Sequence, residues 1–169
     1  DPNFSRAVIN SDAEYPEDLP FEDFLVESLE KTLNDSKIKV LIIDNITYLK
    51  NETEKSKNAL PLMKHLKALK NKYCLSILIL AHTPKRDTSK PMTQNDLQGS
   101  KMLMNFCDSS FAIGESHTDN NMKYIKQIKQ RSTEQIYGAE NVCVCQIIKP
   151  ENCIKFDFMA FGSEYEHLT

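Results

Sequence analysis

Residues 38–44 have the sequence IKVLIID, and residues 74–82 have the sequence CLSILILAH. Each segment is a run of β-branched residues and leucines with little polar alternation. The first ends on Asp44 and the second on His82. Such runs are typical of strands that are buried on both faces. A helical pattern lies between them, so the sequence predicts a βαβ unit with parallel strands.

Asp44 and His82 are the first candidate site. Parallel strands bring their carboxyl ends to one edge of the sheet, which is where open α/β sheets bind ligands. There Asp44 could hold Mg²⁺ through water, and His82 could bond a γ-phosphate or an attacking water. Each residue also has a plainer interpretation: Asp44 is a common turn former after a strand, and His82 could simply bond nearby backbone.

Size and composition limit the classes of protein. The chain has 169 residues, of which 40% are hydrophobic and 27% charged, as expected for one α/β domain over residues 1–169. A net charge of −3 means that any contact with DNA must come from a local basic patch. No apolar run is long enough to span a membrane, and no signal-peptide pattern is present.

The five cysteines are odd in number and contain no C-x-x-C pair. They are typical of reduced thiols in a cytoplasmic protein, and we expect that location. The first residue is not methionine, from which we expect the chain to be a fragment of a longer protein.

Periodicity predicts the remaining elements. Helices are expected over residues 19–33, 59–72 and 97–107, and a short strand over residues 6–9. Another apolar segment covers residues 109–114, and further strands are expected over residues 122–130, 142–149 and 154–161. The last three are expected to form antiparallel hairpins that extend the sheet.

A basic loop follows His82. Residues 83–96 carry Lys85, Arg86 and Lys90, which could neutralise the backbone of single-stranded DNA. No aromatic residue is interleaved for base stacking, so a solvated loop is the alternative interpretation.

Two further groups could contact phosphates. Lys129 and Arg131 are two residues apart near the end of a strand, so both side chains can project from one face toward a triphosphate. The alternative interpretation is an ordinary basic strand end. Ser100, within Gly99–Ser100–Lys101, could bind an anion at the start of a helix. Alternatively, this segment is a tight turn with Asp96 as its cap.

In this order the motifs resemble a known family. Residues 36–135 are similar to the later part of a RecA-like ATPase domain, closest to the RepA-like replicative helicases grouped with the AAA ATPases. The most specific match is LAHTPK at residues 80–85, followed by Gly99 and Ser100. The resemblance implies a mostly parallel sheet flanked by helices, with an antiparallel C-terminal extension. It also implies a ring or filament that uses ATP and Mg²⁺.

The resemblance assigns roles residue by residue. Asp44 would be the Walker B carboxylate, with Asn45 and Ser100 as further nucleotide contacts. His82 would be the sensor, and Lys129 and Arg131 would reach a neighbouring subunit's nucleotide. The loop with Lys85, Arg86 and Lys90 would face a channel that carries single-stranded DNA.

The chain departs from this family in one large respect. It contains no G-x-x-x-x-G-K-[ST] phosphate loop, and no glutamate matches the family's catalytic one; Asp12 and Glu14 are weak substitutes. We therefore expect the C-terminal part of a DNA-coupled ATPase, which begins after the phosphate loop and binds ATP weakly by itself. The alternative is a nucleotide-independent module for DNA binding or oligomerisation.

Overall fold

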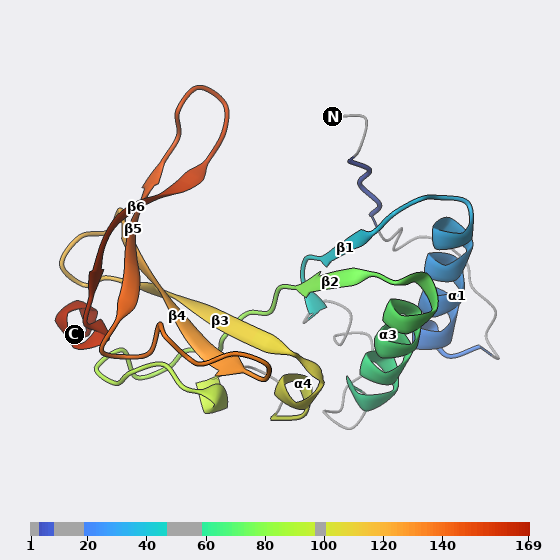
Figure 1. The fold of residues 1–169 in the computed structure, drawn as a ribbon, viewed down its shortest axis with the longest axis horizontal. Coiled ribbons are helices and arrows are strands. Elements are labelled where there is room, and N and C mark those ends of the chain that lie inside the picture. The colour runs from blue at the N-terminus through green and yellow to red at the C-terminus, as the bar shows by residue number, and fades with distance from the viewer. Residues whose placement is uncertain (1–3, 9–18, 47–58, 97–100) are drawn as a thin grey trace.

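A computed structural model describes residues 4–8, 19–46, 59–96 and 101–169, and Figure 1 shows its elements. The first half contains α1 (Phe21–Asn34), β1 (Val40–Ile43), α3 (Ala59–Tyr73) and β2 (Ser76–Ile79). The second half contains η1 (Gln94–Asp96), α4 (Lys101–Phe106), β3 (Ser109–Glu115), β4 (Met122–Gln130), β5 (Val142–Ile148), β6 (Lys155–Gly162) and η2 (Glu164–His167).

Strands β1 and β2 form a parallel pair in which Val40 lies opposite Ser76 and Ile43 opposite Ile79. This confirms the predicted parallel βαβ unit. Helices α1 and α3 lie together on one side of the pair (Figure 1). Their apolar stripes form the first core with the two strands and α4, through buried leucines that include Leu33, Leu66 and Leu103.

The other four strands form a separate antiparallel sheet in the order β3-β4-β5-β6. Its core side packs Tyr124, Val142 and Val144 against Met92 from the loop after β2. The predicted RecA-like, mostly parallel sheet is therefore wrong. The described part of the chain forms a two-stranded parallel sheet and a four-stranded antiparallel sheet, with few helices.

The connections explain this difference. The apolar segment noted at residues 109–114 forms most of β3, which runs through a short connection into β4 and pairs with it antiparallel. A short connection between two strands allows only antiparallel pairing, whereas parallel pairing needs a long crossover. The three antiparallel strands predicted after residue 121 are confirmed, with β4 at its predicted bounds.

The prediction that β1 and β2 are buried on both faces is also wrong. Val40, Ile42 and Leu78 are exposed, because helices cover only one side of β1 and β2 in the described part of the chain. The strand predicted over residues 6–9 is not formed at residues 6–8, and residue 9 lies outside the described ranges.

Helix α3 ends without glycine. Cys74 takes a left-handed backbone conformation with φ of 53°, and the Leu75 amide donates to the Lys70 carbonyl at 2.9 Å. This is the hydrogen bond of a Schellman ending, in which glycine is the usual residue. It turns the chain directly into β2.

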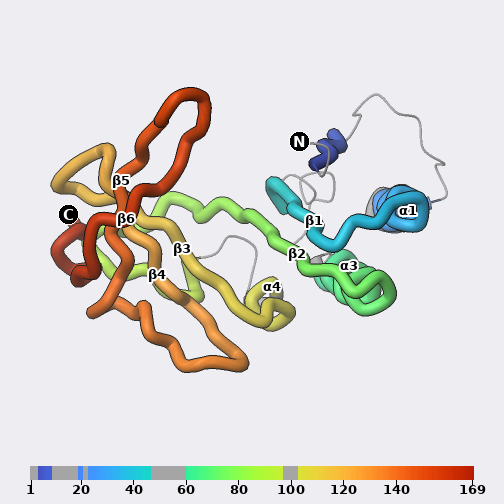
Figure 2. The backbone as a smooth tube through the Cα atoms, turned by 45° about the horizontal axis from the view of Figure 1, so that its top comes forward, coloured from blue at the N-terminus to red at the C-terminus, as the bar shows by residue number. Residues whose placement is uncertain are grey.

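Figure 2 shows the hairpin of β5 and β6 extending beyond the rest of its sheet. In the described ranges, no helix has the length and apolar character needed to cross a bilayer.

Candidate functional site

Asp44 and His82 follow neighbouring parallel strands at the same edge of the two-stranded sheet. The Leu80 amide donates to the Ile43 carbonyl at 2.9 Å, and the Ile46 amide donates to the Leu80 carbonyl at 2.9 Å. Ile46 is buried in the first core, which anchors the backbone just after Asp44. The side chains of Asp44 and His82 are both exposed.

This edge offers one carboxylate rather than a complete cation site. Among the described residues, no three His, Cys, Asp or Glu side chains converge on a point that could hold a metal ion. Mg²⁺ is commonly held by one or two carboxylates together with water and substrate phosphates. Asp44 fits that role only when phosphates supply most of the ligands. Asn45 lies beside it, half-buried, and its peptide bond to Asp44 is cis.

The predicted phosphate cations Lys129 and Arg131 both contact the end of α4. Lys129 Nζ donates to the Met104 carbonyl, and an Arg131 guanidinium nitrogen donates to the Asn105 carbonyl at 2.7 Å. Arg131 also lies 3.7 Å from the Asp108 carboxylate. Cations favour the carboxyl end of a helix, where carbonyls lack intrahelical partners. In this chain the pair therefore fastens α4 to β4.

The basic loop partly neutralises itself. Arg86 donates to the Lys90 carbonyl at 2.6 Å, and the Lys90 ammonium lies 3.0 Å from the Asp87 carboxylate. Hydrogen bonds from Ser89, followed by that from Lys90, lower the pKa of Asp87 to about 2. Of the three predicted DNA contacts, only Lys85 is exposed without a role in holding the loop.

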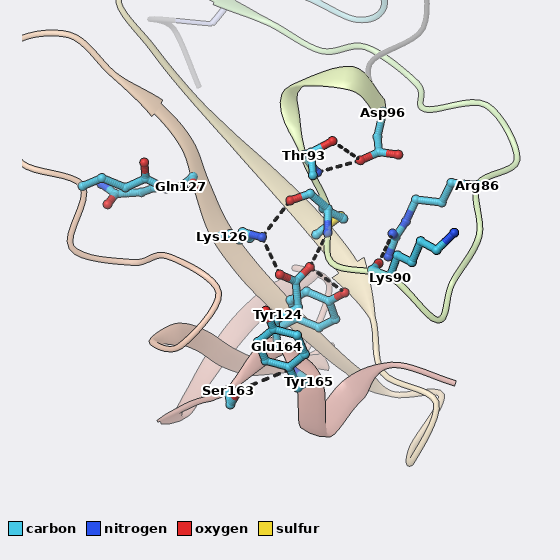
Figure 3. A network of polar contacts seen from close by, with 12 residues as sticks. Arg86, Lys90, Thr93, Asp96, Tyr124, Lys126, Gln127, Ser163, Glu164 and Tyr165 are labelled. Carbon is cyan, nitrogen blue, oxygen red and sulfur yellow. Dashed lines mark hydrogen bonds and ion pairs between the residues drawn. The ribbon is translucent and has the colours of Figure 1, made fainter.

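A buried polar network, which the sequence did not predict, fixes this loop to the second sheet (Figure 3). Glu164 of η2 accepts from Lys126 Nζ at 2.5 Å and from the Met92 amide at 2.7 Å. Lys126 also donates to the Met92 carbonyl at 2.7 Å. Burial, and then the charge of Glu164, raise the pKa of Tyr124 to about 12.

Next to this network, His167 stacks on Tyr124 with ring centroids 5.4 Å apart. Its Nδ1 lies 2.9 Å from the Ser116 hydroxyl, and both side chains are buried. These contacts attach η2 to the end of β3. A possible signal in the sequence was Lys126, a charged residue at a core position of an otherwise alternating strand.

The remaining candidates, Ser100, Asp12 and Glu14, lie outside the described residues. The structure thus places Asp44 and His82 after paired strands and brings both Lys129 and Arg131 to the end of α4, while Arg86 and Lys90 bond within their own loop.

Comparison with models of protein families gave no match to this chain, and a search of curated proteins also found none.

Proposed function

We propose that this chain supplies the cation-associated and phosphate-sensing edge of an ATPase that acts on DNA. The observation that carries the proposal is the parallel pairing of β1 and β2, which aligns Asp44 and His82 at one edge. Asp44 would orient the hydration shell of Mg²⁺, and His82 would bond the γ-phosphate or the attacking water.

The proposal requires a phosphate cradle from residues other than those of this chain. The sequence has no phosphate loop, and a single carboxylate does not hold Mg²⁺ without phosphate ligands. The complete protein would therefore bind ATP and Mg²⁺ together, as a ring or filament. The free cysteines support a reducing, cytoplasmic location.

Asp44→Asn in the complete protein tests the first role. The amide keeps the shape of the side chain and removes its charge, so we expect Mg²⁺-dependent ATP turnover to fall about 100-fold or more. Asp35→Asn is the matched control, because Asp35 is also exposed but follows α1. Equal turnover in wild type and Asp44→Asn would remove the proposed role.

The role of His82 is tested by a pair of variants. His82→Ala removes the hydrogen bond to phosphate, whereas glutamine can still supply one. We expect His82→Ala to lose turnover while His82→Gln keeps a substantial part of it. Identical losses in the two variants would contradict a sensor that acts through a hydrogen bond.

DNA contact is tested most cleanly at Lys85, since Arg86 and Lys90 also hold the loop. We expect Lys85→Ala to weaken single-strand binding and to reduce its salt dependence by roughly one phosphate contact. Lys37→Ala is the control, because Lys37 is exposed and lies before β1. An unchanged affinity and salt slope in Lys85→Ala would remove the loop from the DNA contact.

The alternative function is a nucleotide-independent module for oligomerisation or DNA binding. One observation favours it: Lys129 and Arg131 contact α4 in the same chain. Under this alternative, Arg131→Ala lowers stability and leaves ATP turnover per folded molecule unchanged. Under the ATPase proposal, ATP turnover also falls when Arg131→Ala subunits are mixed with wild-type subunits.

A further inference from the structure

Four cations from two distant parts of the chain gather around one carboxylate. Lys70 of α3 donates to the Asp108 carboxylate at 2.7 Å, and Arg131, just after β4, lies 3.7 Å from the same group. Lys67 precedes Lys70 by three residues, so the two are neighbours on one face of α3. Lys129 reaches the same end of α4 as Arg131. We term these five residues the α4 cluster.

The charges of the cluster act on one another. The hydrogen bond from Lys70, and then its positive charge, lower the pKa of Asp108. The charges of Arg131 and Lys67 lower it in the same direction. Lys67 thus belongs to the cluster, although it forms no ion pair within the described ranges of the chain.

Asp108 neutralises only part of this positive charge. In the described part of the chain it is the one carboxylate that forms an ion pair with Lys70 or Arg131. Lys129 and Arg131 bond carbonyls at the end of α4, and a carbonyl fixes a cation without cancelling its full charge. The α4 cluster therefore holds four cations against one carboxylate, on a chain whose net charge is −3. Repulsion among the cations destabilises the folded chain, and a bound anion would relieve it.

The cluster is open to solvent. The side chains of Lys70 and Arg131 are 43% and 49% exposed, and Lys67 is exposed as well. Polar exposed residues next to the cluster include Asn71, Asn105, Ser109 and Ser132. Contacts between proteins depend on buried aromatic or aliphatic anchors, whereas nucleic-acid interfaces are more polar and much more positive. The composition of this surface therefore favours nucleic acid over an acidic protein.

The cations form a row. Asp108 lies between Lys70 and Arg131, where α4 is placed between α3 and the four-stranded sheet (Figure 1). Lys67 extends the row by about 4.5 Å along the axis of α3. Successive phosphates on one strand of duplex DNA rise by about 3.4 Å, so a row of this length meets more than one phosphate. A polyanion fits this arrangement better than a single phosphate group does.

We propose that the α4 cluster is a second DNA-contact surface of this chain, at which Lys67, Lys70 and Arg131 bind the phosphate backbone. The inference rests on the proposed function only in naming DNA as the polyanion, and it uses neither Asp44 nor the loop that carries Lys85. Contacts of this kind add affinity without reading base sequence, because they meet only the phosphates.

Fluorescence anisotropy with a labelled oligothymidylate, without nucleotide and over a range of salt concentrations, tests the proposal. Lys67→Glu places a carboxylate among the cations, and we expect the affinity at low salt to fall about tenfold. In Lys67→Ala the slope of log affinity against log salt should decrease by about 0.7, the value for one phosphate contact of a single strand.

Lys149→Glu is the matched control. Lys149 is exposed and follows β5, at the base of the turn to β6, and this variant has the same net charge as Lys67→Glu. We expect its affinity to change less than about twofold, because salt screens exposed charges that lie far from the contact.

Asp108→Asn should raise the affinity for DNA. The amide keeps the shape of the side chain and removes the carboxylate that opposes phosphate, so we expect binding about threefold tighter and a steeper salt slope. A loss of fold does not produce tighter binding, so this variant separates a binding site from a structural role. Asp157→Asn is the control, because Asp157 is also an exposed partner of a lysine, Lys155, and should leave the affinity unchanged.

Each of the following results would overturn the inference. Equal losses in Lys67→Glu and Lys149→Glu would mean that affinity follows net charge, and no gain in Asp108→Asn would mean that the cluster does not meet phosphate. Polyglutamate that displaces the labelled strand as well as unlabelled oligothymidylate does would assign the cluster to an acidic protein segment. Weakened binding in Lys85→Ala with normal binding in Lys67→Glu would overturn this inference alone and leave the proposed function standing.

Discussion

Lys126 and Glu164 form an ion pair with their charged atoms 2.5 Å apart, although 38 residues separate them in the chain. Both side chains are almost completely buried. The pair is completed by the amide and carbonyl of Met92, so the C-terminal η2, the central strand β4 and the loop after β2 meet at one point.

Breaking this pair from one side should be costly. Lys126→Met leaves the Glu164 carboxylate buried without its cation, and we expect the free energy of unfolding to fall by about 3–5 kcal/mol. Replacing both, Lys126→Met with Glu164→Leu, should recover much of that loss, because no unpaired charge remains. Urea denaturation measures each value.

The exposed pair Lys155–Asp157 is the control for this prediction. Its atoms are 3.1 Å apart, but both side chains are about half exposed. We expect Lys155→Met to change stability by less than about 1 kcal/mol. Similar losses in Lys126→Met and Lys155→Met would contradict a special role for the buried pair.

Gly114 makes room for the Tyr124 ring. A Cβ at this position would lie 2.2 Å from Tyr124 Cζ, and the ring is held by buried neighbours. We expect Gly114→Ala to lower the free energy of unfolding by about 1–3 kcal/mol through overpacking. In Gly138→Ala the nearest atom is 3.9 Å away, so that variant should be close to wild type. Thermal unfolding of the two variants compares them directly.

Cys74→Gly should stabilise the protein. Cys74 has a φ of 53°, which glycine adopts without the steric cost that other residues incur. We expect a gain of about 0.5–1 kcal/mol in the free energy of unfolding, measured by denaturant titration. Cys153→Gly, in the exposed turn between β5 and β6, should give no gain. A loss of stability in Cys74→Gly would mean that the thiol contributes more than the backbone costs.

Tyr124 should titrate later than the other tyrosines. Its pKa is raised to about 12, mainly because the buried phenolate would lose its hydration. The unfolded chain releases this proton near pH 10, so the folded state binds more protons between about pH 10 and 12. The stability contributed by the neutral phenol is complete below pH 10 and declines as the pH rises through this window.

Ultraviolet titration tests this assignment, since the chain has six tyrosines. We expect one late component in wild type that disappears in Tyr124→Phe. The stability of Tyr124→Phe should also decline less steeply above pH 10. A late component that persists in Tyr124→Phe would assign the raised pKa to another tyrosine.

Local elements were largely predictable because their signals lie within a few residues. The helical periodicity of residues 59–72 predicted α3, and the strand pattern of residues 154–161 predicted β6. The βαβ order also predicted that Asp44 and His82 would follow parallel strands at one edge. The partners of Lys129 and Arg131 were not predictable, because the end of α4 is 25 residues away in sequence.

By itself, the sequence determined the spacing of apolar residues, and this spacing decided which segments became helices and strands. It also determined which strands were joined by short turns. Only the tertiary structure decided which strands share a sheet, which apolar faces stay uncovered, and where the charge of Lys126 is neutralised. The physical reason is the distance along the chain over which each interaction acts. Backbone preference acts between neighbours, whereas pairing, burial and ion pairing depend on which distant segments meet.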